Sequence, residues 1–263
     1  MSLIMGRCLG VIVVYDPLRA SSAVARFKDF IANSFSDHCI RVVTNHPGIK
    51  GDIVGSNDCA EFSGWEEGIC DEDYEEYDIF ICANDTFNTR RAFGEEEERR
   101  FLEELVKARS HTRSYLIGDL HWHINHNFIM RREKCVLKWV RTHIFAISTE
   151  AAKKTSGVAL SKSEIVSMVN VDGDGNFVLS KDIPEVVRRR VEDWLRPADP
   201  SLGWHGSQRA SRSHLTLKAM CVLQELDLTR RCVEAGVRIY STARVGRREF
   251  LLSMVYNFEH RVL

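Results

Sequence analysis

The sequence lacks the paired cysteines that metal-binding and redox motifs require. Its eight cysteines include no Cys-x-x-Cys pair, and several lie in apolar runs, where free thiols behave as small hydrophobic side chains. This spacing excludes a zinc ribbon and provides no disulfide framework, so we expect a reducing compartment. The sequence also lacks an apolar run near the roughly 18 residues of a membrane span. The first ten residues are too short and too soon interrupted for a secretory signal, so we predict a cytoplasmic protein.

Charge is balanced over the whole chain but not along it. Residues 1–130 carry 13 Lys and Arg against 22 Asp and Glu, whereas residues 131–263 carry 23 against 15. A basic half can face phosphates, an anionic membrane surface or nucleic acid. Because the basic residues are scattered instead of forming a tract with interleaved aromatic residues, we do not expect nucleic acid as a partner.

The N-terminal half has the pattern of alternating strands and helices. Strand-like runs are expected at 8–16, 39–45, 77–83 and 114–118, and helical spacing is expected at 19–34 and 94–110. The run 8–16 is β-branched and apolar, as in a strand buried on both faces. A strand, a helix and a second strand in succession favour a parallel sheet with a right-handed crossover. The pattern predicts an α/β fold.

The C-terminal half has a different pattern but no sign of a separate domain. Residues 135–148 are predicted to be extended, and helices are predicted over 184–195 and 213–236, separated by a loop-like stretch rich in Gly, Ser and Pro. We find no internal repeat and no low-complexity tract. The simplest interpretation is one domain over 1–263, with an N-terminal half at 8–118 and a more divergent half at 135–263.

Polar residues follow three consecutive predicted strands. Asp16 follows the first, Thr44-Asn45-His46 the second, and Asn84-Asp85-Thr86 the strand 77–83. Ligands of doubly wound sheets bind beyond the carboxyl ends of the strands, which favours a ligand-facing Asp85. The other interpretation is that Asn, Asp and Thr only open turns, because their side chains bond to nearby backbone.

A second candidate lies in the helix that ends near Gly236. Glu225, Leu228 and Cys232 fall on one helix face, and Gly236 suits the left-handed residue that follows a helix. An ordinary helix with an exposed Glu225 explains this pattern equally well.

The stretch ELDLTRRCVEAGVRIYS resembles the corresponding region of family 2-like glycosyltransferases with the GT-A fold. In that register Glu225 matches the acidic residue taken as catalytic base, Asp227-Leu228 an Asp-Leu pair, and Arg231 an arginine. The stretch Asn84-Asp85-Thr86 stands where such enzymes place a metal-binding Asp-x-Asp. The segments SNDCAEFSGWEEGI, YDIFICANDTF and WVRTHIFAIS are also similar to bacterial polysaccharide-assembly transferases, including rhamnan-synthesis-type proteins. Two departures are that Asn84-Asp85-Thr86 keeps one carboxylate and that Gln224 precedes Glu225.

The resemblance implies a GT-A-like fold, a Rossmann-type mixed sheet flanked by helices, in which 8–118 binds the nucleotide and 135–263 binds the acceptor. It implies a nucleotide-diphosphate sugar as donor, a glycan or lipid-linked acceptor in bacterial surface polysaccharide assembly, and Mg²⁺ or Mn²⁺ held by Asp85. Glu225 is then the base of an inverting reaction. A lipid-linked acceptor would bring the protein to the inner face of the membrane. We interpret Arg188-Arg189-Arg190 as a solvated helix face, and a weak contact with that anionic surface is the other interpretation. The residues expected to bind the nucleotide sugar are Asp16, Asn57, Glu61, Asn84, Asp85 and Arg231, with Trp65 and Trp204 as candidates for stacking on sugar rings.

Other interpretations remain open. A non-catalytic nucleotide- or sugar-binding domain of the same fold would explain the departures from the family motifs. A nucleotidyltransferase is less favoured, because YDPLRASS contains no Gly-rich phosphate loop after the first strand. The histidines of HWHINH (121–126) suggest zinc only weakly. The stretch NVDGDGNFVLSK has Lys181 where a calcium loop needs a bidentate Glu.

Overall fold

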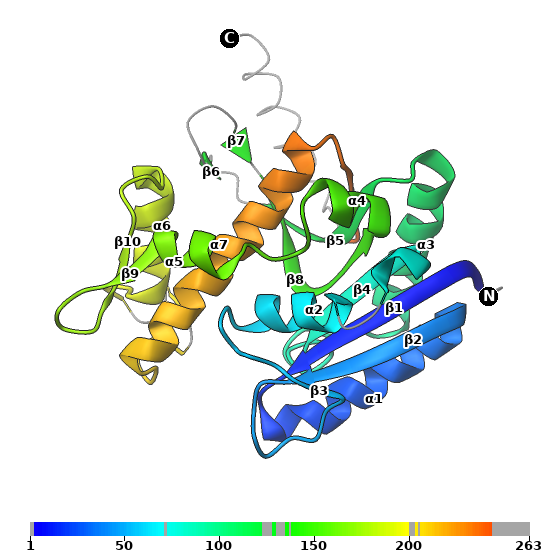
Figure 1. Ribbon diagram of the computed structural model, residues 1–263, viewed down its shortest axis with the longest axis horizontal. Helices are drawn as coiled ribbons and strands as arrows, with labels where there is room; N and C mark the ends of the chain where they lie inside the picture. Colours follow the sequence, from blue (N-terminus) through cyan, green and yellow to red (C-terminus); the bar gives the residue numbers. More distant parts are fainter. Residues whose placement is uncertain are drawn as a thin grey trace, which may run out of the picture.

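The protein is described here by a computed structural model, drawn in Figure 1. The structure describes residues 3–70, 73–122, 128–129, 135–136, 138–199, 203–204 and 206–243. The histidines at 123 and 126 lie outside these residues.

A seven-stranded mixed sheet forms the centre of the fold. Its strand order is β3-β2-β1-β4-β8-β5-β11. Strands β1, β2, β3 and β4 run parallel, β8 runs antiparallel to both β4 and β5, and β11 is parallel to β5. The strand bounds are β1 Ile4–Val14, β2 Phe35–Thr44, β3 Ile53–Val54, β4 Ile79–Asn84, β5 Tyr115–Trp122, β8 Lys138–Ser148 and β11 Arg238–Ser241.

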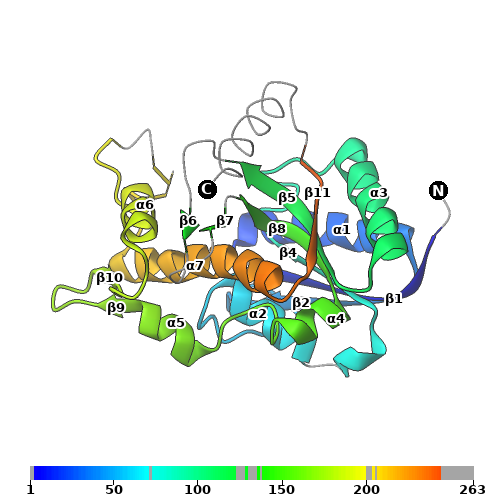
Figure 2. The same cartoon turned by 90° about the horizontal axis from the view of Figure 1, so that it is seen from above.

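Helices cover both faces of the sheet (Figure 2). On one face α1 (Pro17–Ser34) and α3 (Glu95–His111) pack Phe27, Phe30 and Phe101 against β1, β4 and β5. On the other face lie α2 (Glu61–Cys70), α4 (Thr149–Lys154) and the long α7 (Arg212–Glu234). Because β1 and β4 are covered on both faces, they are apolar at nearly every position.

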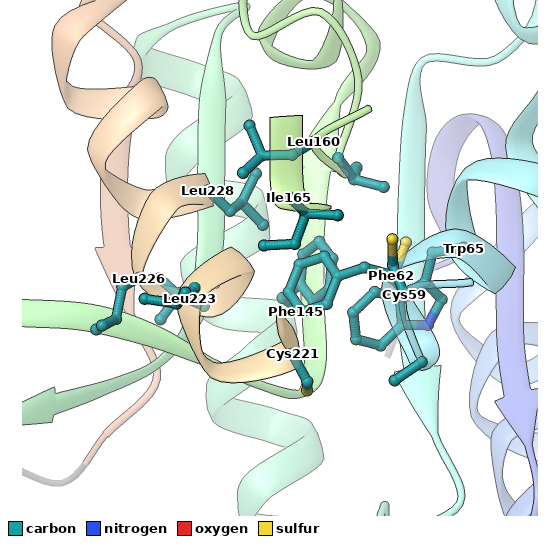
Figure 3. Close-up of a cluster of buried hydrophobic side chains, with 14 of the residues drawn as sticks. Cys59, Phe62, Trp65, Phe145, Leu160, Ile165, Cys221, Leu223, Leu226 and Leu228 are labelled. Atoms are coloured by element: carbon teal, nitrogen blue, oxygen red, sulfur yellow. The ribbon is translucent and has the colours of Figure 1, made fainter. Parts of the chain in front are cut away.

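The hydrophobic core on the face covered by α2, α4 and α7 joins the two halves of the chain. Figure 3 shows Trp65 and Phe62 of α2, Phe145 of β8, and leucines of α7 converging in one cluster. The rings of Trp65 and Phe145 meet edge to face, with centroids 5.2 Å apart. This packing holds α7 across the sheet.

A smaller group of elements packs on the N-terminal part of α7. It contains α5 (Lys162–Met168), the hairpin of β9 (Val169–Val171) and β10 (Phe177–Leu179), and α6 (Glu185–Leu195). Val187, Val191 and Leu195 of α6 are buried in the same core as α7. The remaining elements are the short helix η1 (Tyr74–Glu76) and a pair of two-residue strands, β6 (Phe128–Ile129) and β7 (Cys135–Val136).

The predicted α/β fold with a mixed sheet flanked by helices is confirmed. The residues at the start of α1 and after the end of α7 have the capping roles that the sequence indicates. The Asp16 side chain accepts a hydrogen bond from the Leu18 N–H and Pro17 occupies the first turn of α1. Gly236, at φ 71°, follows the end of α7. The predicted N-terminal and C-terminal halves share one sheet, because β8 and β11 lie beside strands of the first half.

Candidate functional site

A cavity of about 540 Å³ lies at the carboxyl edge of the parallel strands. Tyr15 follows β1, and Asn84 ends β4. Because β8 is antiparallel to β4, its first residues lie at the same edge, and α6 and α7 supply the remaining walls. The lining residues are Tyr15, Glu61, Asn84, Thr86, Arg91, Trp139, Arg141, Thr142, His143, Arg190, Val191, Trp194, Lys218, Val222, Glu225 and Leu226.

An irregularity in β8 directs two side chains toward this cavity. Gly118 of β5 pairs with Phe145, but the next residue, Asp119, pairs with Arg141. Three residues of β8, from 142 to 144, therefore have no partners on β5. Such bulges bend a strand and re-aim its side chains, and they are frequent next to functional sites. Two of the three residues, Thr142 and His143, line the cavity.

Glu225 is partly buried in the cavity wall and held in one orientation. Its Oε1 accepts a hydrogen bond from Trp139 Nε1 at 2.8 Å, and its Oε2 accepts one from Thr142 Oγ1 at 2.8 Å. Burial raises the pKa of the Glu225 carboxyl above its ordinary value, although the two hydrogen bonds and the nearby Lys218 oppose the shift. The side chain is thus a fixed carboxylate with increased proton affinity, as a general base requires.

Positive charge exceeds negative charge in the cavity lining. Four cationic side chains line it, against the two carboxylates Glu61 and Glu225. They come from four different segments: Arg91 follows β4, Arg141 lies in β8, Arg190 in α6 and Lys218 in α7. Burial and the neighbouring Arg141 lower the pKa of Arg91. The arrangement therefore favours an anionic ligand.

His143 is neutral at ordinary pH. Burial lowers the pKa of its imidazole to about 4, and the positive charges of Arg91 and Arg141 add to the effect, while Asp119 opposes it. The ring can donate and accept hydrogen bonds in the cavity without adding a charge.

Stability should depend on pH through His143. Its folded-state pKa, about 4, lies below its ordinary value of 6.5, so the unfolded chain binds the proton more tightly and stability falls as the pH decreases from 6.5 toward 4. In His143→Gln we expect a shallower fall of the melting temperature over this range than in wild type. The control is His38→Gln, which replaces an imidazole outside the cavity lining. Equal pH slopes for wild type and His143→Gln would contradict this account.

Asn84 and Glu61 form a polar contact at the floor of the cavity. Asn84 Nδ2 donates to Glu61 Oε1 at 3.3 Å, and Asn84 Oδ1 accepts from the Thr86 N–H at 3.0 Å. All three residues line the cavity, and Glu61 is only 4% exposed. Two of the residues predicted to bind the nucleotide sugar are thus brought together with Glu225.

Asp85 is fully buried beside this floor and does not line the cavity. Its Oδ2 accepts hydrogen bonds from the N–H groups of Tyr15 at 2.8 Å and Asp16 at 2.6 Å. Its Oδ1 has no hydrogen-bond partner and lies 4.0 Å from Arg19 Nη1. Burial raises the pKa of Asp85. The carboxylate thus ties the end of β4 to the connection between β1 and α1.

The surroundings of Asp85 do not fit a divalent cation. One carboxylate oxygen already accepts two N–H groups, and a guanidinium lies near the other, whereas Mg²⁺ requires several oxygen ligands. Among the residues that the structure describes, no group of three or more His, Cys, Asp or Glu side chains is placed to hold a metal ion.

The other predicted binding residues lie outside the cavity lining. Arg231 pairs with the buried Asp227 at 2.8 Å and donates to the carbonyls of Gly157 at 3.0 Å and Val158 at 3.1 Å, which fastens the segment after α4 to α7. Asp16 caps α1 and pairs with Arg19. Asn57 is exposed, with Oδ1 accepting from Asn45 Nδ2 at 3.2 Å.

Trp65 is a core residue, which corrects the suggestion that it stacks on a sugar ring. It is completely buried in the hydrophobic cluster of Figure 3, and its Nε1 donates to the Ala83 carbonyl at 2.7 Å. Trp204 packs near Trp194, with ring centroids 6.5 Å apart, and does not line the cavity. Its partner Trp194 and Trp139 of β8 do line it.

The cationic residues of the cavity were missed by the sequence analysis. Arg190 was interpreted as part of a solvated helix face, yet it lines the cavity together with Trp194, four residues later in α6. Their i, i+4 spacing beside the apolar Val187 and Val191 was the available signal. Arg91 and Arg141 have no comparable signal, because their proximity depends on the pairing of β4 with β8.

Comparisons with protein-family models, with curated proteins and with solved structures find no significant match for this chain. Within the described residues, no helix combines the length and the apolar character needed to cross a membrane.

Proposed function

We propose that this protein is a glycosyltransferase with a GT-A-like fold, which transfers a sugar from a nucleotide-diphosphate sugar to a glycan or lipid-linked acceptor. The observation that carries the proposal is the placement of the Glu225 carboxylate in the wall of a cationic cavity at the carboxyl edge of the sheet. That edge is where α/β sheets bind nucleotides. The cytoplasmic side of bacterial surface polysaccharide assembly is the setting that the sequence resemblance suggests.

The reaction assigns a defined task to Glu225. An acceptor hydroxyl attacks the anomeric carbon of the donor sugar, and the new C–O bond forms as the bond to the diphosphate oxygen breaks. The electron pair of the broken bond leaves with the nucleoside diphosphate. Glu225 takes the hydroxyl proton, which its raised pKa favours. Attack opposite the leaving group inverts the configuration at the sugar carbon.

The rest of the cavity suits the donor. A volume of about 540 Å³ falls within the range of roughly 300–1,000 Å³ that is typical of small-molecule sites. Trp139 and Trp194 offer aromatic surfaces for a sugar ring. The pair of Asn84 and Glu61 offers polar groups that select orientation.

A non-catalytic binding domain of the same fold is the second candidate. It is favoured by Asn84-Asp85-Thr86, because the only carboxylate of this stretch is buried behind the cavity floor. Such a domain would bind the nucleotide sugar and leave it intact.

Thermal unfolding with nucleotides tests donor binding. We expect UDP, GDP, dTDP or CDP to raise the melting temperature, since a ligand at 100 times its Kd adds about 2.7 kcal/mol to the free energy of unfolding. The matched nucleosides, which lack the diphosphate, serve as controls and should have a much smaller effect. If no nucleoside diphosphate changes the melting temperature, both candidate functions are contradicted.

A further inference from the structure

We propose that the cavity binds the donor diphosphate through Arg91, Arg141, Arg190 and Lys218, and that this binding needs no divalent cation. The inference rests on the proposed function, and it names the residues that neutralise the leaving group.

The first support is that four cationic side chains from separate segments converge on one cavity. The four cations come from four segments that are distant in the sequence, namely the connection after β4, the strand β8, and helices α6 and α7. Periodicity within a single helix cannot bring charged side chains from four separate segments into one concave site. The pairing of β4 with β8 brings Arg91 near Arg141, and the packing of α6 and α7 over the edge of the sheet adds Arg190 and Lys218.

The second support is the balance of charge in the cavity. Its lining holds four cationic side chains and two carboxylates. The neutral donors Trp139, Thr142 and Asn84 hold these carboxylates in place without removing their charge, and both carboxylates interact electrostatically with Lys218. Outside the lining, Asp119 pairs with Arg141 at 3.0 Å. Burial lowers the pKa of His143, and the charges of Arg91 and Arg141 lower it further. A bound anion would offset the second of these effects.

The third support is the different placement of neighbouring arginines. Of the three consecutive arginines in α6, only Arg190 lines the cavity. Arg189 is 71% exposed and pairs with Glu185 along the helix, and Arg188 donates to the Ile183 carbonyl at 3.0 Å. Arg189 is therefore a matched control, one residue away from the proposed anion-binding residue Arg190.

The fourth support is the poor fit of a metal ion. The Asp85 carboxylate is engaged by two backbone N–H groups and lies close to Arg19. Within the described part of the chain, no cluster of carboxylate, thiol or imidazole groups replaces it as a cation site. Guanidinium groups bind phosphate oxygens in bidentate fashion and retain their charge. When the C–O bond to the sugar breaks and its electron pair passes to the diphosphate, these groups would stabilise the developing charge.

Calorimetric titration tests metal independence directly. Inorganic pyrophosphate and a nucleoside diphosphate are titrated into the protein in EDTA and, in parallel, with Mg²⁺ or Mn²⁺. We expect binding in EDTA, with an affinity that differs by less than about tenfold, or 1.4 kcal/mol, between the two conditions. Binding only with the divalent cation would overturn the proposal.

Substitutions test the residues. We expect Arg190→Gln to weaken pyrophosphate binding by about tenfold or more, because it removes charge-assisted hydrogen bonds, which are roughly twice as strong as neutral ones. Arg189→Gln should bind like wild type. Thermal unfolding checks that both variants are folded, and Lys218→Met provides an independent test from another helix. Equal affinities for wild type, Arg190→Gln and Lys218→Met would overturn the assignment.

His143 provides a readout that does not depend on turnover. Pyrophosphate in EDTA should raise the imidazole pKa above its value of about 4, because the anion offsets the charges of Arg91 and Arg141. An NMR titration of the ring protons measures this shift, and an unchanged pKa at saturation would place the anion elsewhere. If pyrophosphate binds as expected but no nucleotide sugar is consumed, the anion site stands and the transferase assignment fails. If sugar transfer occurs only with Mn²⁺, the transferase stands and metal independence fails.

Discussion

Glu225→Gln is expected to lower the rate of sugar transfer by about 10²–10⁴-fold, the contribution typical of general base catalysis. The amide cannot accept the proton of the attacking hydroxyl. It can still fill the same space, because Oε1 can accept from Trp139 Nε1 while Nε2 donates to Thr142 Oγ1, the two partners of the present carboxylate. Nucleotide affinity and melting temperature should therefore change little, and steady-state kinetics with equilibrium binding separates these effects.

The control for this variant is Glu192→Gln in α6, which removes an exposed carboxylate outside the cavity lining. It should transfer sugar at the wild-type rate. In wild type, the rate should rise with pH through the pKa of Glu225, which burial raises above its ordinary value of 4.5, because only the deprotonated carboxylate accepts a proton. A full transfer rate in Glu225→Gln would show that another group is the base.

Asp85→Ala is expected to destabilise the fold strongly. The change leaves the part-buried N–H groups of Tyr15 and Asp16 without their acceptor, and an unsatisfied buried group costs about 1–3 kcal/mol. Asp85→Asn should be milder, since the amide oxygen can still accept both hydrogen bonds. Chemical denaturation of the two variants and wild type measures the free energies of unfolding.

Asp29→Ala is the matched control for Asp85, because Asp29 is an exposed carboxylate in the neighbouring helix α1. Its free energy of unfolding should equal that of wild type. The opposite pattern would be wild-type stability in Asp85→Ala together with loss of Mn²⁺-dependent nucleotide binding. That pattern would identify Asp85 as a metal ligand and would contradict its assignment as a brace between β4 and the β1–α1 connection.

The fold could be predicted where local chemistry and burial agree. The apolar runs of β1 and β4 indicate strands covered on both faces, and Asp16, Pro17 and Gly236 mark helix ends by their side-chain and backbone properties. The antiparallel direction of β8 could not be predicted. The residues of this 11-residue strand indicate an extended segment but not the direction in which it runs relative to β4.

The candidate site could be predicted only in part. Glu225, Glu61 and Asn84 were selected as site residues and do line one cavity. Asp85 and Arg231 are residue types that often bind ligands. Here Asp85 accepts hydrogen bonds from two backbone N–H groups, and Arg231 pairs with Asp227 and donates to a backbone carbonyl. The cationic cluster escaped prediction because its members meet only after β4 pairs with β8 and after α6 and α7 pack over the sheet edge.

The most direct test of the account is an NMR-monitored transfer assay. The nucleotide sugar whose nucleotide most raises the melting temperature is incubated with the protein and with panels of glycan and polyprenyl-phosphate acceptors. The account predicts release of the nucleoside diphosphate together with a new anomeric signal of inverted configuration. A donor that binds in the cavity but stays intact with every acceptor would contradict the assignment as a transferase and leave a nucleotide-sugar-binding domain.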